Sequence, residues 1–207
     1  MSENGIAKLG ILGGSFNPIH CGHMSMARGF IELLGLDMLL LIPVWSPPHK
    51  SGREMLAADE RLRLCQIACK DDPRMEASNI EIRRGGTSYT VDTLRTLAEQ
   101  YPGAALSMIT GADMFLTLEK WKEFDEIARR AELCACARHP GELAALRTYA
   151  KKLENAYGAH CKIGDFPVVE VSSTQLRGLL KKGESVDGLL PGDVYAYIRA
   201  QNFYKDL

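Results

Sequence analysis

Residues 13–23 read Gly-Gly-Ser-Phe-Asn-Pro-Ile-His-Cys-Gly-His, between the apolar run 7–12 and the amphipathic stretch 22–34. This order predicts a strand, a tight turn and a helix. Gly13 and Gly14 let the backbone approach a ligand closely and adopt dihedrals that other residues avoid. The start of the helix offers unpaired N–H groups and the positive end of its dipole. The stretch therefore predicts an anion site at a strand-to-helix turn.

Two histidines stand at the expected start of this helix. His20 and His23 are three residues apart, so both rings can reach the same side of the turn and donate hydrogen bonds to phosphate oxygens. The glycines match neither the dinucleotide fingerprint nor the P-loop and would be weak evidence alone. A metal site formed by His20, Cys21 and His23 is the alternative. Because no fourth ligand is evident, we favour phosphate binding with no protein-held metal.

Short apolar runs alternate with helical patterns along the rest of the chain. The expected strands are 7–12, 38–42, 76–82, 104–109, 133–137 and 166–171, and the expected helices are 22–34, 58–70, 90–100, 124–130, 141–155, 174–181 and 191–204. The alternation predicts an α/β fold, with a single doubly wound, mainly parallel, Rossmann-like sheet and ligands at the carboxyl ends of its strands. We expect one domain over 1–207 with a C-terminal helical segment at about 174–204. The irregular segments 43–55 and 83–89 should be exposed loops near the same rim.

Composition limits the classes of partner. The chain has 207 residues and a formal net charge of −1, so we expect no nucleic-acid-binding surface and a small anionic ligand. Residues 1–8 lack an apolar secretory core, and no later stretch reaches the roughly 18 to 20 apolar residues of a membrane span. The six cysteines stand in apolar contexts that suit reduced thiols. These features predict a cytoplasmic protein that binds no membrane.

A second polar segment reads Val171-Ser172-Ser173-Thr174-Gln175-Leu176-Arg177 and lies between an expected strand and an expected helix. Ser172, Ser173 and Thr174 place three hydroxyls beside free backbone donors, and Arg177 follows one turn into the helix. Ordinary N-capping would explain each hydroxyl singly. Beside the first turn, phosphate binding is the better interpretation, because an arginine can clamp a phosphate through several hydrogen bonds.

The histidine turn resembles the H-x-G-H signature of the nucleotidyltransferase superfamily, and residues 13–23 resemble the opening of bacterial nicotinate mononucleotide adenylyltransferases. Asn17 departs from this pattern, which commonly has aspartate there. Residues 171–177 resemble the second signature of the family, I-S-S-T-x-I-R. The resemblance implies an enzyme of NAD biosynthesis that joins ATP and nicotinate mononucleotide into deamido-NAD and releases pyrophosphate. It also implies Mg²⁺ bound with the ATP phosphates.

Three further segments resemble the same family. Pro47-Pro48-His49-Lys50 is similar to its P-P-H-K segment, where a basic residue approaches the triphosphate; a solvated loop is the alternative. Ser88-Tyr89-Thr90 is similar to its S-Y-T turn, where backbone donors near Thr90 face the nicotinate carboxylate. Trp121 matches the tryptophan that stacks on the pyridine ring. Simple core packing is the alternative for Tyr89 and Trp121.

Two positions concern the adenosyl end of ATP. Asp113 belongs to a Gly111-Ala112-Asp113 segment that resembles the G-x-D of the family, whose carboxylate accepts from ribose hydroxyls; capping of the next helix is the alternative. Arg138 falls where the family usually has Arg-Pro-Gly, although His139 interrupts that pattern here.

The resemblance thus implies a complete candidate site. The catalytic residues would be His20, His23, Arg177 and Lys50. The residues that bind ATP and its phosphates would be Gly13, Gly14, Ser15, Phe16, Ser172, Ser173, Thr174, Asp113 and Arg138, and those that bind the mononucleotide would be Ser88, Tyr89, Thr90 and Trp121. Two other functions stay open: an adenylyltransferase that prefers nicotinamide mononucleotide, and a non-catalytic nucleotide-binding sensor. The apolar side of the last helix also suits a homo-oligomer.

Overall fold

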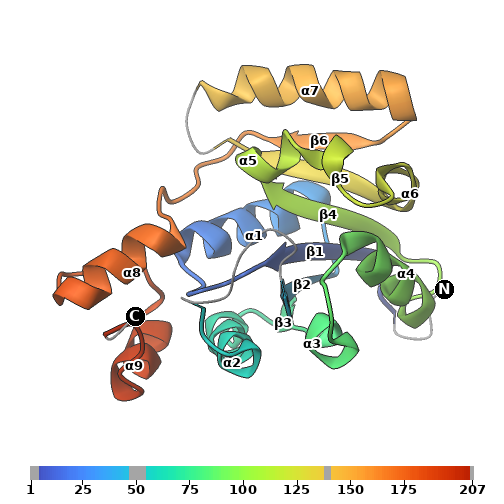
Figure 1. Cartoon of the computed structure of the whole chain (residues 1–207). Helices are drawn as coiled ribbons and strands as arrows, with labels where there is room; N and C mark the ends of the chain where they lie inside the picture. Colours follow the sequence, from blue (N-terminus) through green and yellow to red (C-terminus); the bar gives the residue numbers. More distant parts are fainter. Residues whose placement is uncertain (1–4, 47–54, 138–140, 206–207) are drawn as a thin grey trace.

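A parallel sheet forms the centre of the computed structural model, which describes residues 5–46, 55–137 and 141–205. Within these ranges the sheet has six strands in the order β3-β2-β1-β4-β5-β6, and each neighbouring pair is parallel (Figure 1). The strands are β1 (Lys8–Gly14), β2 (Met38–Pro43), β3 (Met75–Ala77), β4 (Ala105–Gly111), β5 (Ala131–Cys136) and β6 (Cys161–Gly164). The expected doubly wound, Rossmann-like α/β fold is confirmed.

Helices connect the strands and cover both faces of the sheet. In the described ranges they are α1 (Cys21–Leu34), α2 (Ala58–Cys69), α3 (Ile80–Arg84), α4 (Thr90–Gln100), α5 (Ala112–Phe115), α6 (Phe124–Arg130), α7 (Glu142–Tyr157), α8 (Ser173–Lys182) and α9 (Gly192–Ala200), with a short 3₁₀ turn η1 (Leu118–Lys120). The expected helices are present within two residues, except that the last one ends earlier than expected. Among the described helices, none has the length and apolar character needed to cross a membrane.

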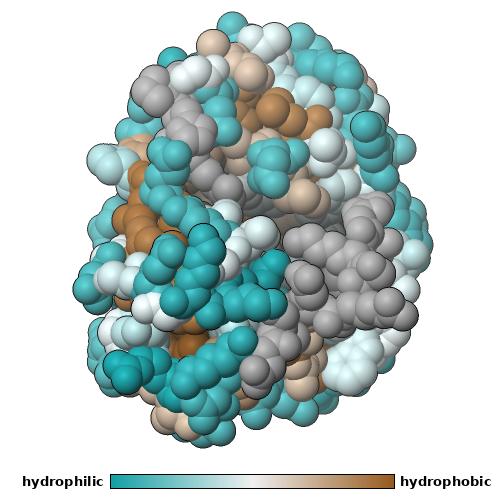
Figure 2. All heavy atoms as spheres, turned by 60° about the vertical axis from the view of Figure 1, so that its left-hand side comes forward, coloured by the Kyte–Doolittle hydropathy of each residue, from teal (hydrophilic) through white to brown (hydrophobic). Residues whose placement is uncertain are grey.

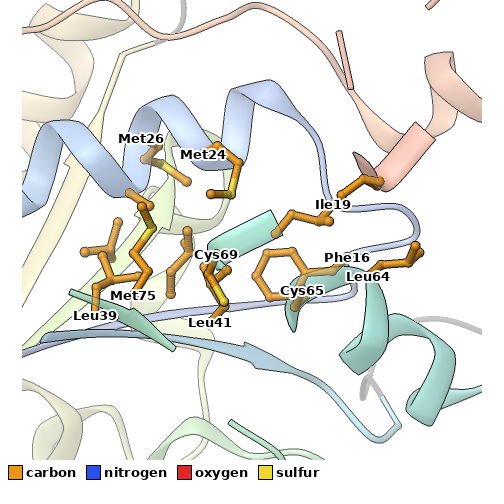
Figure 3. Packing of buried hydrophobic residues seen from close by; sticks show 14 of the residues in the cluster. Phe16, Ile19, Met24, Met26, Leu39, Leu41, Leu64, Cys65, Cys69 and Met75 are labelled. Atoms are coloured by element: carbon orange, nitrogen blue, oxygen red, sulfur yellow. The ribbon is translucent and has the colours of Figure 1, made fainter. Parts of the chain in front are cut away.

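The two faces of the sheet carry separate hydrophobic clusters. Leu39 and Leu41 of β2 pack on one face with α1, α2, α8 and α9, whereas Leu40 and Ile42 pack on the other with α4, α6 and α7. This alternation follows from the two-residue period of a strand, and burial of each such side chain stabilises the fold by roughly 1.5–3 kcal/mol. Figure 3 shows Phe16 packed within the first cluster, so the loop after β1 is anchored in the core.

The strand order reverses between β1 and β4, which are adjacent in the sheet. Gly14 ends β1 and Gly111 ends β4, so both chain segments leave the sheet at the same edge. In open α/β sheets this switch point is where ligands bind. Helices α8 and α9 lie beyond this edge (Figure 1, left). Figure 2 shows the molecule turned toward this side, where hydrophilic side chains predominate among the coloured residues and hydrophobic ones form smaller patches.

The expected strand over 76–82 is wrong in its second half. The strand β3 ends at Ala77, and α3 follows from Ile80. The backbone N–H of Arg83 donates to the carbonyl of Asn79 at 2.8 Å, and that of Gly85 donates to Glu81 at 3.0 Å. Over so few residues, alternation of apolar side chains does not distinguish a strand from a helical turn. The backbone groups here are satisfied locally.

The expected strand over 166–171 is also wrong, because the sixth strand is β6 at Cys161–Gly164. We call residues 165–172 the crossing segment; it runs along α1 instead of entering the sheet. The backbone N–H of Val169 donates to the Ser25 hydroxyl at 3.0 Å. A Cβ placed on Gly29 would lie 2.2 Å from the ring of Phe166, and one on Gly22 would lie 2.7 Å from the carbonyl oxygen of Val169. The crossing segment therefore packs against small residues on one face of α1.

Candidate active site

The two histidines form a reciprocal cap at the start of α1. The backbone N–H of His23 donates to Nδ1 of His20, and the backbone N–H of His20 donates to Nδ1 of His23, both at 3.3 Å. The rings stack with centroids 3.6 Å apart and an interplanar angle of 21°. An Nδ1 that accepts a hydrogen bond carries no proton, so each neutral ring carries its proton on Nε2. Nε2 is therefore the ring nitrogen that can donate in each histidine; the side chain of His20 is 3 % exposed, and that of His23 is half-buried.

The glycines of the turn leave space beside the backbone, and they do not adopt unusual dihedrals. Neither Gly13 nor Gly14 has a positive φ, so the expectation of special dihedrals there is wrong; Phe16 adopts φ 46° instead. A Cβ on the exposed Gly13 would meet no atom closer than 4.0 Å, whereas one on Gly14 would lie 3.2 Å from the Phe16 ring. Gly13 thus leaves room over the end of β1. Ser15 is half-buried beside it.

Phe16 is a buried residue that packs against His23. Its side chain is 1 % exposed, and its ring contacts the ring of His23 edge-on with centroids 5.0 Å apart. A side chain so deeply buried contributes packing under the histidine, so any contact of Phe16 with a ligand falls to its backbone.

The second segment is bonded directly to the first. A guanidinium N–H of Arg177 donates to the carbonyl of Asn17 at 2.9 Å, and the Ser173 hydroxyl donates to the carbonyl of Pro18 at 2.9 Å. The fold therefore brings together residues about 160 positions apart in the chain. Ser172 accepts from the Gln175 N–H at 3.1 Å, so the N-capping alternative holds for Ser172.

The remaining member of this segment is Thr174. It is exposed, and its hydroxyl lies 3.4 Å from the second Nη of Arg177. Thr174 thus stands on the same side of α8 as the arginine and beside its guanidinium.

The buried arginine of α2 was not identified from the sequence. Arg61 is 1 % exposed, and it donates to the carbonyls of Ser15 at 2.8 Å, Val44 at 2.6 Å and Leu56 at 3.0 Å. Burial lowers its pKa from the usual value, yet an arginine stays protonated. The guanidinium therefore ties the glycine turn to the end of β2 and to the start of α2. The signal in the sequence was an arginine one turn before Leu64, on the apolar side of the helix.

The turn before α4 lies beside the end of β2. The backbone N–H of Trp45 donates to the Ser88 hydroxyl at 3.0 Å, and that of Ser88 donates to the carbonyl of Ser46 at 3.0 Å. The described parts of the two loop segments expected at one rim thus meet there. Thr90 starts α4 directly after this turn, where backbone N–H groups have no partner within the helix.

The aromatic residues of this region are half-buried. Lys122 lies over the ring of Tyr89 with its Nζ 4.5 Å from the centroid, and Trp121 precedes it at the end of η1. Both aromatic side chains pack against the second hydrophobic cluster while part of each stays exposed. The core-packing alternative and the ligand-stacking role are therefore compatible at Tyr89 and Trp121.

A buried carboxyl supports the same turn and was also missed. Glu81 of α3 is 6 % exposed, and the Thr93 hydroxyl donates to its Oε1 at 2.7 Å. Arg84 in turn donates to that hydroxyl at 3.0 Å. Burial raises the pKa of Glu81, and hydrogen bonds from Ser88 and Thr93 partly oppose this effect.

Asp113 lies in the first turn of α5, immediately after β4 ends at Gly111. It is exposed at the switch point, and the N-cap of α5 is Gly111 with no side-chain cap, so Asp113 does not cap the helix. Lys50 and Arg138 lie outside the described residues. Within the described ranges, no group of three or more His, Cys, Asp or Glu is arranged to hold a metal ion. Burial raises the pKa of the Cys21 thiol.

The exposed Gly13, the paired histidines and the arginine bonded to the same loop lie at the switch point of a parallel sheet, where nucleotide-binding α/β proteins hold their ligands. A family model described as cytidylyltransferase-like matches residues 11–179. The chain belongs to this family and, within it, to the nicotinate-nucleotide adenylyltransferases.

Relatives in three bacteria carry the name probable nicotinate-nucleotide adenylyltransferase. Those of Symbiobacterium thermophilum and Synechococcus sp. are 33% and 37% identical, over 96% of this chain and 96% and 95% of their own. The relative of Lactococcus lactis is 35% identical over 99% of both chains.

Solved structures share the fold. A Plasmodium falciparum nicotinic acid mononucleotide adenylyltransferase complexed with NaAD superposes with a TM-score of 0.77 at 16% identity, covering 96% of this chain and 97% of its own. A putative nicotinate-nucleotide adenylyltransferase from Vibrio parahaemolyticus reaches 0.68 at 20% identity, covering 97% of each chain.

Proposed function

We propose that this protein transfers the adenylyl group of ATP to nicotinate mononucleotide, forming deamido-NAD and pyrophosphate. The observation that carries the proposal is the direct bond between the two motifs, from Arg177 to the carbonyl of Asn17, in the loop that leads to two histidines bonded through Nδ1. This arrangement supports a pocket for a triphosphate, because its donors are cationic or N–H groups at one edge of the sheet.

In this reaction a 5′-phosphate oxygen of the mononucleotide attacks the α-phosphorus of ATP. The new P–O bond forms as the bond from the α-phosphorus to the bridging oxygen of the β-phosphate breaks, and pyrophosphate leaves with that electron pair. No side chain acts as nucleophile. His20, His23 and Arg177 hold the phosphates in line and stabilise charge on their oxygens, which is the main source of rate in such transfers. Lys50 is assigned an auxiliary role in this scheme.

The ATP end uses the open space over Gly13, with the backbone of Gly14, Ser15 and Phe16 lining the turn. Ser173 supports the turn through the carbonyl of Pro18. Asp113, exposed at the end of β4, is assigned to the ribose hydroxyls. Ser172, Thr174 and Arg138 complete the proposed ATP side.

The acceptor end lies at the turn before α4. Backbone N–H groups at Thr90 suit a ring carboxylate, and the exposed part of Trp121 suits stacking on the pyridine ring. Ser88 holds the turn against β2 through Trp45, and Tyr89 lies beneath Lys122. A site built to pair a carboxylate disfavours an amide, because its donors would lose their anionic partner.

Magnesium enters this proposal as part of the substrate. Mg²⁺ prefers oxygen ligands and usually reaches such sites on phosphates and water. The described donors here are ring nitrogens, a guanidinium and backbone N–H groups, which suit phosphate oxygens better than a cation. We therefore assign Mg²⁺ to the ATP phosphates and no described side chain to the metal.

The test is pyrophosphate release from MgATP, with nicotinate mononucleotide and nicotinamide mononucleotide compared at equal concentration. We expect release that depends on the acceptor and is at least about tenfold faster with the acid. Equal rates would contradict the substrate choice. ATP binding without pyrophosphate release would favour a nucleotide sensor instead. Light scattering of the same sample measures the proposed homo-oligomer, and localisation of the tagged chain tests the cytoplasmic assignment.

A further inference from the structure

The last described turn of the chain folds back into the core. Helix α9 ends at Ala200, and Asn202 and Tyr204 then adopt φ values of 55° and 67°. Such positive values are sparsely populated by residues other than glycine, so this reversal is held by its surroundings. Its result is that the side chain of Tyr204 is only 2 % exposed although it stands near the end of the chain.

The hydroxyl of Tyr204 contacts the loop between β1 and α1, which belongs to the first motif. It donates to Oδ1 of Asn17 at 2.9 Å, and the backbone N–H of Leu56 donates to the same oxygen at 3.1 Å. Asn17 itself is 5 % exposed. One side-chain oxygen therefore joins the C-terminal turn, the start of α2 and the loop after β1.

The same residue holds the arginine of the second motif. The carbonyl of Asn17 accepts from Arg177 at 2.9 Å, so its side chain and its main chain serve two different partners. Because an asparagine side chain is short, the orientation of its amide restricts the peptide that carries this carbonyl. The Tyr204 hydroxyl lies close to the charges of both Arg177 and Arg61.

We propose that Tyr204 is a positioning residue for ATP, which acts through Asn17 to fix Arg177 and the loop before His20. This inference rests on the proposed function for its kinetic consequence but not for its binding consequence. The Tyr204 hydroxyl donates one of the hydrogen bonds that the buried Asn17 Oδ1 accepts, and its loss leaves the orientation of that amide less restricted. The carbonyl of Asn17 then no longer holds the Arg177 guanidinium in one position, and ATP binds to a less ordered site.

The test compares Tyr204→Phe with Tyr197→Phe in the full-length protein. Both variants remove one phenolic hydroxyl that makes one hydrogen bond; that of Tyr197 donates to Glu60 of α2 at 3.3 Å and does not involve Asn17. Circular dichroism and thermal unfolding check that both variants fold. We expect a larger loss of thermal stability from Tyr204→Phe, because its hydrogen bond is buried and that of Tyr197 is only partly buried, with both variants still folded.

The kinetic readouts separate positioning from simple stabilisation. For Tyr204→Phe we expect the KM for ATP to rise about 3- to 10-fold, the size set by one hydrogen bond, while the KM for the acceptor stays within about twofold. Tyr197→Phe should leave both KM values at the wild-type level. An unchanged KM for ATP in Tyr204→Phe, or an equal rise in Tyr197→Phe, would overturn the proposal.

Equilibrium binding of a non-hydrolysable ATP analogue gives a second readout that needs no turnover. In the wild-type background we expect Tyr204→Phe to weaken this binding by the same factor, roughly 3- to 10-fold. In the Arg177→Lys background we expect a clearly smaller effect of Tyr204→Phe. Equal effects in the two backgrounds would show that Tyr204 does not act through Arg177. If the wild-type protein binds the analogue but makes no dinucleotide, the proposed function fails and the positioning role is still judged by these affinities.

Discussion

His20 and His23 each accept, at Nδ1, a hydrogen bond from the backbone N–H of the other. One pair of bonds therefore caps α1, stacks the two rings and determines which ring nitrogen carries the proton. Nδ1 of each ring has the capping role and Nε2 is the atom to which we assign the proposed chemical role, so single substitutions can separate the two.

His20→Asn separates the two roles. Asparagine is a favourable N-cap residue, and its Oδ1 replaces the Nδ1 acceptor, but it has no group at the place of Nε2. We expect the free energy of unfolding to stay within about 1 kcal/mol of wild type. Turnover should fall at least about 100-fold, as when one donor of a transition-state site is removed.

Pyrophosphate release and chemical denaturation measure the two quantities for His20→Asn. His23→Ala is the companion variant, for which we expect a similar loss of turnover. Wild-type turnover in His20→Asn would remove the His20 ring from the mechanism.

Arg61→Met tests the buried guanidinium. The substitution leaves the carbonyls of Ser15, Val44 and Leu56 without their donor, and buried carbonyls without a partner cost about 1–3 kcal/mol each. We expect a loss of roughly 3 kcal/mol in the free energy of unfolding, since local relaxation recovers part of this. We also expect weaker binding of ATP, because Ser15 belongs to the glycine turn.

Arg63→Met is the matched control, on the same helix with an exposed side chain. Its effect on unfolding should stay within about 0.5 kcal/mol. Equal destabilisation by the two variants, measured by urea titration, would show that the contacts of Arg61 contribute nothing special.

Gly22→Ala tests how the crossing segment is placed. A methyl group at position 22 would lie 2.7 Å from the carbonyl oxygen of Val169, which is backbone and cannot rotate away. We expect a loss of about 1–3 kcal/mol in stability. Turnover should fall as well, because the crossing segment leads into α8 and Arg177.

Gly178→Ala supplies the contrast for this prediction. The same change in the exposed part of α8 meets no atom within 4 Å and should stabilise the helix by about 0.5–1 kcal/mol. Thermal unfolding of both variants checks the signs. A stable, active Gly22→Ala protein would show that the crossing segment shifts without cost.

Glu81→Gln tests the buried carboxyl through its pH dependence. Burial raises the pKa of Glu81 in the folded state above the unfolded value. The folded protein then holds the proton more tightly, so this group's contribution to stability is present at low pH and is lost as pH rises through the folded pKa. Glutamine does not ionise in this range.

The free energy of unfolding of Glu81→Gln, relative to wild type, should therefore rise between about pH 4 and about pH 7. Urea titrations at the two pH values measure it. A difference that does not change with pH would mean that Glu81 ionises alike in both states.

Most residues of the proposed site were predicted from local patterns. The glycine pair, the histidines and the Ser172–Arg177 segment each lie within a short stretch of sequence, and their combination predicts anion binding although no one of them does so alone. Arg61 and Glu81 were missed because a single charged residue within a helical pattern is normally solvated. Only the partners of these two residues, which come from distant parts of the chain, reveal their burial.

The errors in the strand prediction have a similar origin. Residues 166–171 form a short apolar run, as many strands do, yet the Phe166 ring lies against Gly29 of α1 and the backbone of Val169 lies against Gly22 and Ser25. A short apolar run can pack on a helix or enter a sheet, and its sequence carries no information about which surface is available.

The sequence by itself determined the alternating α/β architecture, the turn at Gly13–His23 and the family to which the chain is similar, because these depend on periodicity and on short contiguous motifs. Only the tertiary structure decided which atoms of the histidines are donors, how Asn17 joins Tyr204 to Arg177, and why Gly22 has to be small. The histidine bonds join residues three apart and depend on the exact geometry of the helix start, whereas the other two relationships join segments up to 187 residues apart. These long-range contacts exist only once the hydrophobic clusters have packed the helices onto the sheet.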